Sequence, residues 1–251
     1  MPNPTKLRLD KLLVDLGLAA SRERAQALIL AGKVLCNEQK IEKPGTSVPA
    51  DAAIRVLGED LKYVSRGGLK LEKALDHWQI DLRGRVCMDV GASTGGFSDC
   101  MLRRGAGRVI AADTGYGQIA ARLRADPRVK LLERTNARYL LAEQVGEPLP
   151  SFAAIDVSFI SATLVLPPVR AVCLPDEQGR CELVVLVKPQ FEVGREKVGK
   201  GGIVRDPEAQ AGAVEKVRQT VSGLRAKVID VIESPILGAE GNREFLLYTS
   251  F

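Results

Sequence analysis

A glycine-rich segment carries the clearest chemical signal in the sequence. Residues 88–97 read MDVGASTGGF, in which apolar residues give way to glycines and hydroxyl side chains. Such a turn between a strand and a helix lets backbone amides approach a nucleotide-like ligand. A tight turn alone would account for one glycine but not for Gly91, Gly95 and Gly96 together, and the spacing is neither G-x-G-x-x-G nor a P-loop. We therefore expect a ligand site at this turn.

Three charged residues stand where further strands are expected to end. Asp113 closes the next apolar stretch, at a position where a carboxylate can hold ribose hydroxyls. Asp156 and Lys188 end two later apolar stretches, and the strands of a parallel sheet end at one common edge. Either charge alone is equally well explained by a structural ion pair. Both together, beside a glycine-rich turn, indicate a catalytic Lys–Asp pair.

The elements that must position these residues alternate along the chain from Gly68 onward. Helices are expected at 69–78, 97–104 and 119–124, and strands at 86–90, 109–112, 129–132, 153–157 and 183–187. This alternation is typical of the α/β class, with a mostly parallel sheet covered by helices on both faces.

The first sixty residues follow a different pattern, which predicts a small α+β domain. One short helix is expected on residues 9–16, before Gly17, and a second from Ser21 to a stop at Gly32. Short strands are expected at 34–36, at Ile41 and at 53–57. A polar segment then indicates a joint. The domains expected are 1–58 and 69–251, with a linker at 59–68.

Composition narrows the class of protein. The chain has 251 residues, of which 45% are hydrophobic and 27% charged, as in a globular protein with a buried core. No apolar stretch approaches the roughly 20 residues of a membrane span, and no signal-type segment opens the chain, so we expect a cytoplasmic protein. Five cysteines without a C-x-x-C pair and a single histidine argue against a zinc site. The net charge of +5 is compatible with a polyanionic partner.

Six ordered segments resemble the TlyA (hemolysin A) family of ribosomal RNA 2′-O-methyltransferases, which has the FtsJ-like (RrmJ) fold. They are SRGGLKL (65–71), DVGASTGGF (89–97), DTGYGQ (113–118), DVSFIS (156–161), VKPQFE (187–192) and GNRE (241–244). The resemblance covers nearly the whole chain. It implies a Rossmann-like sheet that binds S-adenosylmethionine (SAM) and requires no metal. RLDKLL (8–13) and SRERA (21–25) resemble a small RNA-binding domain first described in a small-subunit ribosomal protein.

The resemblance also assigns roles to residues. The family's Lys-Asp-Lys-Glu catalytic tetrad falls on Lys70, Asp156, Lys188 and Glu244. The expected cofactor-binding residues are Asp89, Gly91, Ala92, Ser93, Thr94, Gly95, Gly96, Phe97, Asp113 and Asn136. A ribose 2′-hydroxyl is a weak acid, and a lysine beside a carboxylate can take its proton or stabilise the alkoxide. We therefore assign Lys188 to the 2′-oxygen, Asp156 to orienting Lys188, and the other two residues to positioning.

RNA contact is expected mainly from basic residues of the first domain. Residues 1–50 hold eight Lys/Arg against five Asp/Glu, which on charge alone is better explained by solvated helix faces. The domain resemblance favours phosphate contacts instead. The expected RNA-binding residues are Arg8, Lys11, Arg22, Arg24, Lys33, Arg66 and Lys200. The expected partner is ribosomal RNA or a ribosomal subunit. The protein is expected to be a monomer and not to bind a membrane.

Three other functions are compatible with parts of the sequence. The family's hemolysin name suggests a membrane-active protein, but no apolar span supports one. A non-catalytic RNA-binding factor would not need the tetrad, and an NAD-dependent oxidoreductase would be expected to carry G-x-G-x-x-G. The family implies a cytidine of 23S rRNA as target, and of 16S rRNA as well in some members. Only a short segment precedes Leu7, and this compact form is similar to family members that act on 23S rRNA alone. We therefore expect 23S rRNA as the target.

Overall fold

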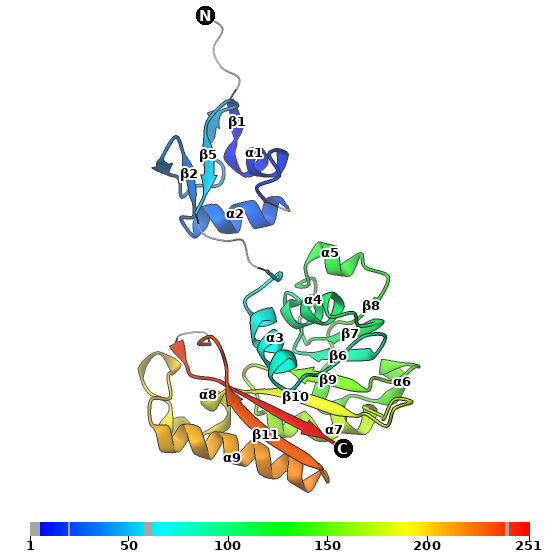
Figure 1. Ribbon diagram of the computed structural model, residues 1–251. Coiled ribbons are helices and arrows are strands. Elements are labelled where there is room, and N and C mark those ends of the chain that lie inside the picture. Colours follow the sequence, from blue (N-terminus) through cyan, green and yellow to red (C-terminus); the bar gives the residue numbers. More distant parts are fainter. Residues whose placement is uncertain (1–5, 20, 58–61, 239–240) are drawn as a thin grey trace, which may run out of the picture. The chain divides into compact units, whose positions relative to one another are not determined.

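The computed structural model describes residues 6–19, 21–57, 62–238 and 241–251. The chain forms two compact units, Met1–Asp60 and Leu61–Phe251, and each has a hydrophobic core of its own. Figure 1 shows the helices and strands of both units.

The first unit packs two short helices against two small sheets. α1 (Leu9–Asp15) and α2 (Arg22–Leu30) bury leucine and isoleucine side chains in its core. The Ser21 side chain begins α2 by accepting a hydrogen bond from the Arg24 amide at 3.2 Å. The sheet orders are β3-β2-β5 and β1-β4, with β1 (Lys6–Arg8), β2 (Val34–Cys36), β3 (Gln39–Lys40), β4 (Ser47–Pro49) and β5 (Ile54–Val56).

The strands of this unit differ in part from those expected. The strand that returns after β2 is β3, which ends at Lys40, so the expected Ile41 lies just after the strand and not in it. β1 and β4 were not expected at all. Each has three residues, and they pair far apart in the sequence, with Leu7 opposite Val48. Strands this short carry too little periodicity to be recognised from sequence.

The second unit contains a seven-stranded sheet of order β11-β12-β10-β9-β6-β7-β8. Neighbouring strands pair in parallel except at β12, which runs antiparallel to both β10 and β11. The strands are β6 (Val86–Val90), β7 (Arg108–Ala112), β8 (Val129–Leu132), β9 (Phe152–Ile155), β10 (Glu182–Val187), β11 (Val228–Glu233) and β12 (Phe245–Ser250). β6 to β10 lie where the sequence pattern predicts strands, and the α/β, Rossmann-like class is confirmed.

The strand order reverses at β6. From β6 the chain adds β7 and β8 on one side, then returns to add β9 and β10 on the other. The C-terminal ends of β6 and β9 are therefore neighbours, with Val90 opposite Ile155, and their onward connections leave in opposite directions. Open α/β sheets bind ligands at such a switch point.

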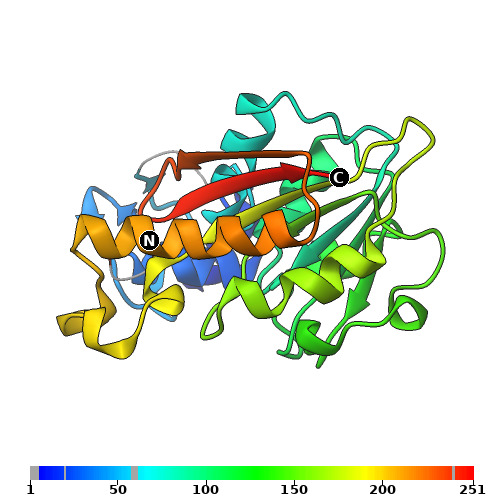
Figure 2. The ribbon, with the colours of Figure 1, turned by 90° about the horizontal axis from the view of Figure 1, so that it is seen from below.

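Helices cover both faces of the sheet, as Figures 1 and 2 show. One face carries α3 (Gly67–His77), α4 (Gly96–Arg103) and α5 (Ala121–Arg124), and the other carries α6 (Ala142–Val145), α7 (Leu166–Val172) and α9 (Pro207–Gly223). Cys87 faces one core and Met88 the other, because side chains alternate along a strand. Short 3₁₀ turns lie at Ala137–Tyr139, Ala162–Leu164, Arg195–Lys197 and Lys200–Gly202.

The segment before α3 is packed into the second unit. Tyr63 is only 2% exposed, and its hydroxyl donates to Glu72 at 2.8 Å. The Val64 amide donates to the buried carboxylate of Asp99 at 2.9 Å. The later part of the linker expected at 59–68 is thus part of this unit. Residues 58–61 lie outside the described residues.

Candidate active site

The site lies where β6 and β9 end side by side. Gly91 has φ +87°, and a Cβ there would come within 2.4 Å of the Asp156 carbonyl oxygen. The Gly91 and Ala92 amides both donate to Ala112 O, at 2.8 and 3.2 Å. Only glycine fits this approach, because the crowding atom is backbone. Gly91 is therefore needed to bring Asp156 up to the turn, a structural requirement separate from the expected approach of a ligand.

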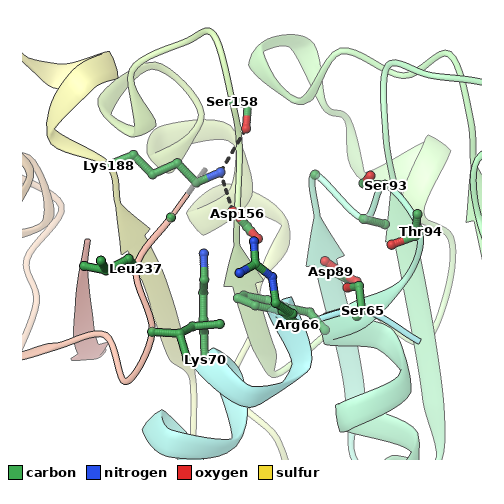
Figure 3. A pocket seen from close by; sticks show the side chains of 17 residues that line it. Ser65, Arg66, Lys70, Asp89, Ser93, Thr94, Asp156, Ser158, Lys188 and Leu237 are labelled. Atoms are coloured by element: carbon green, nitrogen blue, oxygen red, sulfur yellow. Dashed lines mark hydrogen bonds and ion pairs between the residues drawn. The ribbon is translucent and has the colours of Figure 1, made fainter. Parts of the chain in front are cut away.

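A pocket of about 390 Å³ opens at this edge of the sheet, and Figure 3 shows the side chains around it. The glycine-rich turn forms one wall, and the segment before α3 forms another. Loops that follow β9, β10 and β11 complete it. The lining residues are Ser65, Arg66, Gly67, Lys70, Asp89, Gly91, Ala92, Ser93, Thr94, Gly96, Phe97, Asp156, Ser158, Lys188, Ile236, Leu237 and Gly238.

Asp89 places a buried carboxylate on this pocket. One oxygen, Oδ2, accepts from the Ser98 amide at 2.8 Å and from its hydroxyl at 2.6 Å, while Oδ1 has no hydrogen-bond partner. Burial raises the pKa of Asp89 to about 7, and the nearby charges of Asp156 and Asp113 act in the same direction. A buried oxygen of this kind is satisfied by a ligand that brings a donor or a positive charge.

A second pocket of about 460 Å³ adjoins the first and shares Gly91, Ser93, Asp156 and Ser158 with it. Asp113 lines it, and its carboxylate accepts from the amides of Ser93 at 2.8 Å and Gly115 at 2.6 Å. A carboxylate has lone pairs beyond these two, so Asp113 can hold its own loops and a ribose hydroxyl together.

Asn136 lies in the same second pocket, where its side chain accepts from the Arg138 amide at 3.1 Å. The other expected cofactor-binding residues, with the exception of Gly95, line one pocket or both. Gly95 lines neither pocket. It takes φ +95° as the residue before α4, and a Cβ there would meet Leu123 at 2.3 Å.

The four expected catalytic residues form two ion pairs. Lys188 Nζ lies 2.6 Å from Asp156 Oδ1 and donates to Ser158 Oγ at 2.9 Å, as the dashed lines of Figure 3 mark. Lys70 pairs with Glu244. Lys70, Asp156 and Lys188 all line the first pocket, whereas Glu244 lies behind Lys70 and is 2% exposed.

Each lysine is carried by a different element. Lys70 lies in the first turn of α3, and Lys188 follows β10 directly as the residue that begins α8 (Pro189–Glu192). Glu244 precedes β12, whose antiparallel direction brings its first residue to the edge where the parallel strands end. The arrangement presents two cationic groups to one pocket, each directed by a carboxylate, and can stabilise negative charge that develops on a bound hydroxyl.

Two polar side chains of the first pocket were not assigned from the sequence. Ser158 contacts Lys188, and Ser65 lines the pocket beside Gly96, where a Cβ would lie 2.2 Å from its hydroxyl oxygen. Both fall within the segments quoted for the resemblance. Ser158 lies two residues after Asp156, and Ser65 lies five residues before Lys70. This closeness to expected catalytic residues was the signal available in the sequence. Within the described ranges, no three His, Cys, Asp or Glu side chains gather as metal ligands.

The expected RNA-binding residues are spread over both units. Arg8 and Arg22 contact the buried carboxylate of Asp10 at 3.0 and 2.9 Å, and Gln26 donates to it at 3.0 Å. The Arg8 hydrogen bond holds the pKa of Asp10 well below its usual range. Both guanidinium side chains remain about half exposed. Lys11 is exposed, while Arg24 and Lys33 are half-buried.

Arg66 and Lys200 belong to the second unit. Arg66 lines the first pocket, as does Asp156, and Figure 3 labels both side chains. Lys200 is exposed in the loop before α9.

Comparison with known families matches both units of the chain. Residues 63–251 match the family model described as FtsJ-like methyltransferase, and residues 7–54 match the S4 domain.

Individual relatives extend over most of the chain. It is 45% identical over 244 residues to the 16S/23S rRNA (cytidine-2′-O)-methyltransferase TlyA of Mycobacterium tuberculosis, covering 97% of this chain and 89% of that protein. It is 34% identical over 187 residues to the 23S rRNA (cytidine-2′-O)-methyltransferase TlyA of Campylobacter jejuni, covering 74% and 70%. A solved structure from Streptococcus thermophilus, which carries a hemolysin name, is similar with TM-score 0.75 at 42% identity, covering 98% and 88%.

Proposed function

Because the chain belongs to the FtsJ-like methyltransferase family and its first unit to the S4 domain family, we propose that it methylates the ribose 2′-hydroxyl of a cytidine in ribosomal RNA, with SAM as methyl donor. The observation that carries the proposal is the pair of carboxylate-directed lysines on the pocket beside the glycine-rich turn. The proposed place of action is the cytoplasm.

The two pockets fit the two ends of the methyl donor. Asp89, whose Oδ1 has no hydrogen-bond partner, lines the first pocket and suits the positively charged end, while Asp113 in the second suits ribose hydroxyls. When bound, SAM supplies a methyl group made electrophilic by its sulfonium. The shared wall of Gly91 and Ser93 then lies between the two binding regions.

Lys188 is the proposed group at the 2′-oxygen. Its amine, when neutral, would take the hydroxyl proton as the oxygen bonds to the methyl carbon and the carbon–sulfur bond of the donor breaks to leave a neutral thioether. The resulting ammonium would lie beside Asp156, 2.6 Å from its carboxylate. Asp156 and Ser158 fix the direction of the amine, which is the positioning that makes such a transfer fast. Lys70, held by Glu244, adds a second positive charge on the same pocket.

The proposed target is 23S rRNA, with 16S rRNA as a further candidate. Of the two relatives compared, the more similar carries a 16S/23S name and the other a 23S name. One similar solved structure carries a hemolysin name. Among the described residues, no helix is long and apolar enough to cross a membrane.

Isolated ribosomal subunits from a strain that lacks this protein provide the test. Incubation with purified chain and radiolabelled SAM should label rRNA, and mapping of ribose methylation should find a 2′-O-methylcytidine absent from untreated subunits. The Lys188→Ala variant serves as control and should leave the site unmodified. Label on a base, or no label on either subunit, would contradict the proposed function.

A further inference from the structure

Glu192 joins the two loops that carry the Lys188–Asp156 pair. It is the last residue of α8, four residues after Lys188, and is 6% exposed. Its carboxylate reaches the loop that follows Asp156, where Oε1 accepts from the Ala162 amide at 2.6 Å and Oε2 accepts from the Ser161 hydroxyl. The Glu192 side chain thus connects the segment after β9 to the segment after β10 by hydrogen bonds.

Lys216 of α9 holds Glu192 from the opposite side. Its ammonium lies 3.3 Å from Glu192 Oε2 and donates to the Glu192 backbone carbonyl at 2.8 Å. This contact neutralises a buried negative charge and fixes the side chain that carries it. The carboxylate is therefore a rigid connector between loop and helix.

The loop that Glu192 holds is under backbone strain. At its start the Asp156 amide is fixed by Val90 O at 2.8 Å. Phe159, in its middle, has φ +65°, a conformation that side-chain-bearing residues seldom adopt, and it is 92% exposed. Such a conformation persists only where surrounding contacts hold it. Here the Phe159 ring contacts the Phe191 ring, 5.4 Å between centroids, and both ends of the loop are anchored. Glu192 is the anchor at the far end.

We propose that Glu192 is a positioning residue, which holds residues 156–162 in the conformation that places Ser158 and Asp156 against Lys188. This rests on the proposed function, since Glu192 acts through Lys188 and does not touch the pocket. Without it, the loop relaxes at Phe159, and Ser158 no longer directs the Lys188 amine at 2.9 Å. The reacting groups then lose alignment while both pockets stay open.

The kinetic test uses Glu192→Gln, which keeps the shape of the side chain and removes its charge. The single-turnover methylation rate should fall by about 10²-fold, the loss expected when a reacting group moves by roughly 1 Å. SAM and rRNA affinities should stay at the wild-type values. Ser161→Ala, which removes one partner of the carboxylate, should give the same pattern if Glu192→Gln fails to fold.

The matched control is Glu182→Gln, at the opposite end of strand β10. Glu182 is a half-buried acid that is likewise held in a network, paired with Arg85 at 2.5 Å and accepting from Tyr248 at 2.7 Å. Its loss should lower the melting temperature but leave the single-turnover rate of the folded protein unchanged. Equal rate losses in the Glu182 and Glu192 variants would contradict the positioning role and would mean that Glu192 only stabilises the fold.

A double substitution separates positioning from stability. If Glu192 acts only through Lys188, adding Glu192→Gln to Lys188→Ala should cause no further loss of rate. Multiplied losses would overturn the proposal.

Amide hydrogen exchange gives a readout that does not depend on activity. Exchange of residues 157–162 should become faster in Glu192→Gln and stay unchanged in Glu182→Gln. If the wild-type chain methylates rRNA but Glu192→Gln changes neither rate nor exchange, only this inference fails. If the wild-type chain methylates nothing, the proposed function fails, and exchange still decides whether Glu192 holds the loop.

Discussion

The two lysines of the site have different surroundings, which suggests different tasks. Lys188 faces Asp156, which itself lines the pocket, and it also contacts a hydroxyl. Lys70 faces Glu244, which is buried behind it. A proton taken up by Lys188 therefore arrives beside a carboxylate at the pocket, whereas Lys70 is held as a fixed charge.

Substitution of Lys188 separates catalysis from binding. Lys188→Ala should bind SAM and rRNA as the wild type does, because its interaction with the 2′-oxygen strengthens only as the methyl group moves. Its single-turnover rate should fall by about 10²–10⁴-fold, as expected for the loss of a positioned proton acceptor.

Lys188→Arg distinguishes a base from an ion-pair partner. A guanidinium keeps the pair with Asp156 but stays protonated, so the variant should be nearly as slow as Lys188→Ala. Rapid-quench measurement of the methylated product decides whether Lys188 acts as a base or only as an ion-pair partner of Asp156. Near-normal activity of the arginine variant would exclude Lys188 as the base.

Asp89 makes cofactor affinity depend on pH. Its pKa of about 7 means that the carboxylate is largely protonated at pH 6 and ionised at pH 8. A cationic ligand favours the ionised form, so the affinity for SAM should rise with pH, by up to about tenfold per unit below pH 7. Calorimetric titration between pH 6 and 8 measures the slope. Asp89→Asn should bind weakly with little slope, and an unchanged slope in that variant would assign the effect to another group.

The same group affects stability in the absence of ligand. The pKa of Asp89 is raised on folding, from an ordinary value of 3.8 to about 7, so the folded state holds this proton more tightly. Its contribution to stability is therefore greatest at low pH and is lost as pH rises from about 4 to about 7. The melting temperature of the wild type should fall more than that of Asp89→Asn between pH 5 and 7.5.

At the scale of elements, the segment that leads into β12 positions Glu244 through close packing. A Cβ at Gly238 would lie 2.0 Å from Glu244 Oε1 and 2.5 Å from its Cδ. Gly238→Ala should displace the Glu244 carboxylate and weaken its hold on Lys70, which lowers methylation while SAM still binds. Gly212→Ala is the matched control. No atom lies within 4 Å of its added Cβ, and alanine in the middle of α9 should stabilise the protein by about 0.5–1 kcal/mol.

The sequence predicted the central elements well and their outer neighbours poorly. β6, β7, β9 and β10 are buried on both faces and so read as apolar runs, which placed Asp156 and Lys188 at the right edge. The direction of β12 is set by its pairing with β10 and β11, which no local pattern records. Tyr63 was assigned to a linker because its neighbours are polar, although its ring is buried. Ion pairs such as Arg22–Asp10 join distant positions and were equally invisible.

At the scale of the molecule, the boundary between the units can be tested by truncation. A fragment of residues 61–251 keeps Tyr63 and should fold and bind SAM, yet methylate rRNA poorly without the first unit. A fragment of residues 66–251 loses the buried Tyr63 ring, at a cost of about 3–5 kcal/mol. Its melting temperature should be lower by roughly 10 °C. Equal melting temperatures would move the start of the second unit beyond Tyr63, and full activity of either fragment at limiting RNA would remove the need for the first unit.

The antiparallel strand β12 also determines when the enzyme becomes complete. Lys70 and its partner Glu244 are 174 positions apart. At about 5–20 residues per second of synthesis, Lys70 emerges roughly ten seconds or more before the carboxylate that holds it. By then the glycine-rich turn, Asp156 and Lys188 have all been synthesised, and β12 is the strand that lies between β10 and β11 in the finished sheet. The active site is therefore complete only when β12 pairs between β10 and β11 and brings Glu244 to Lys70.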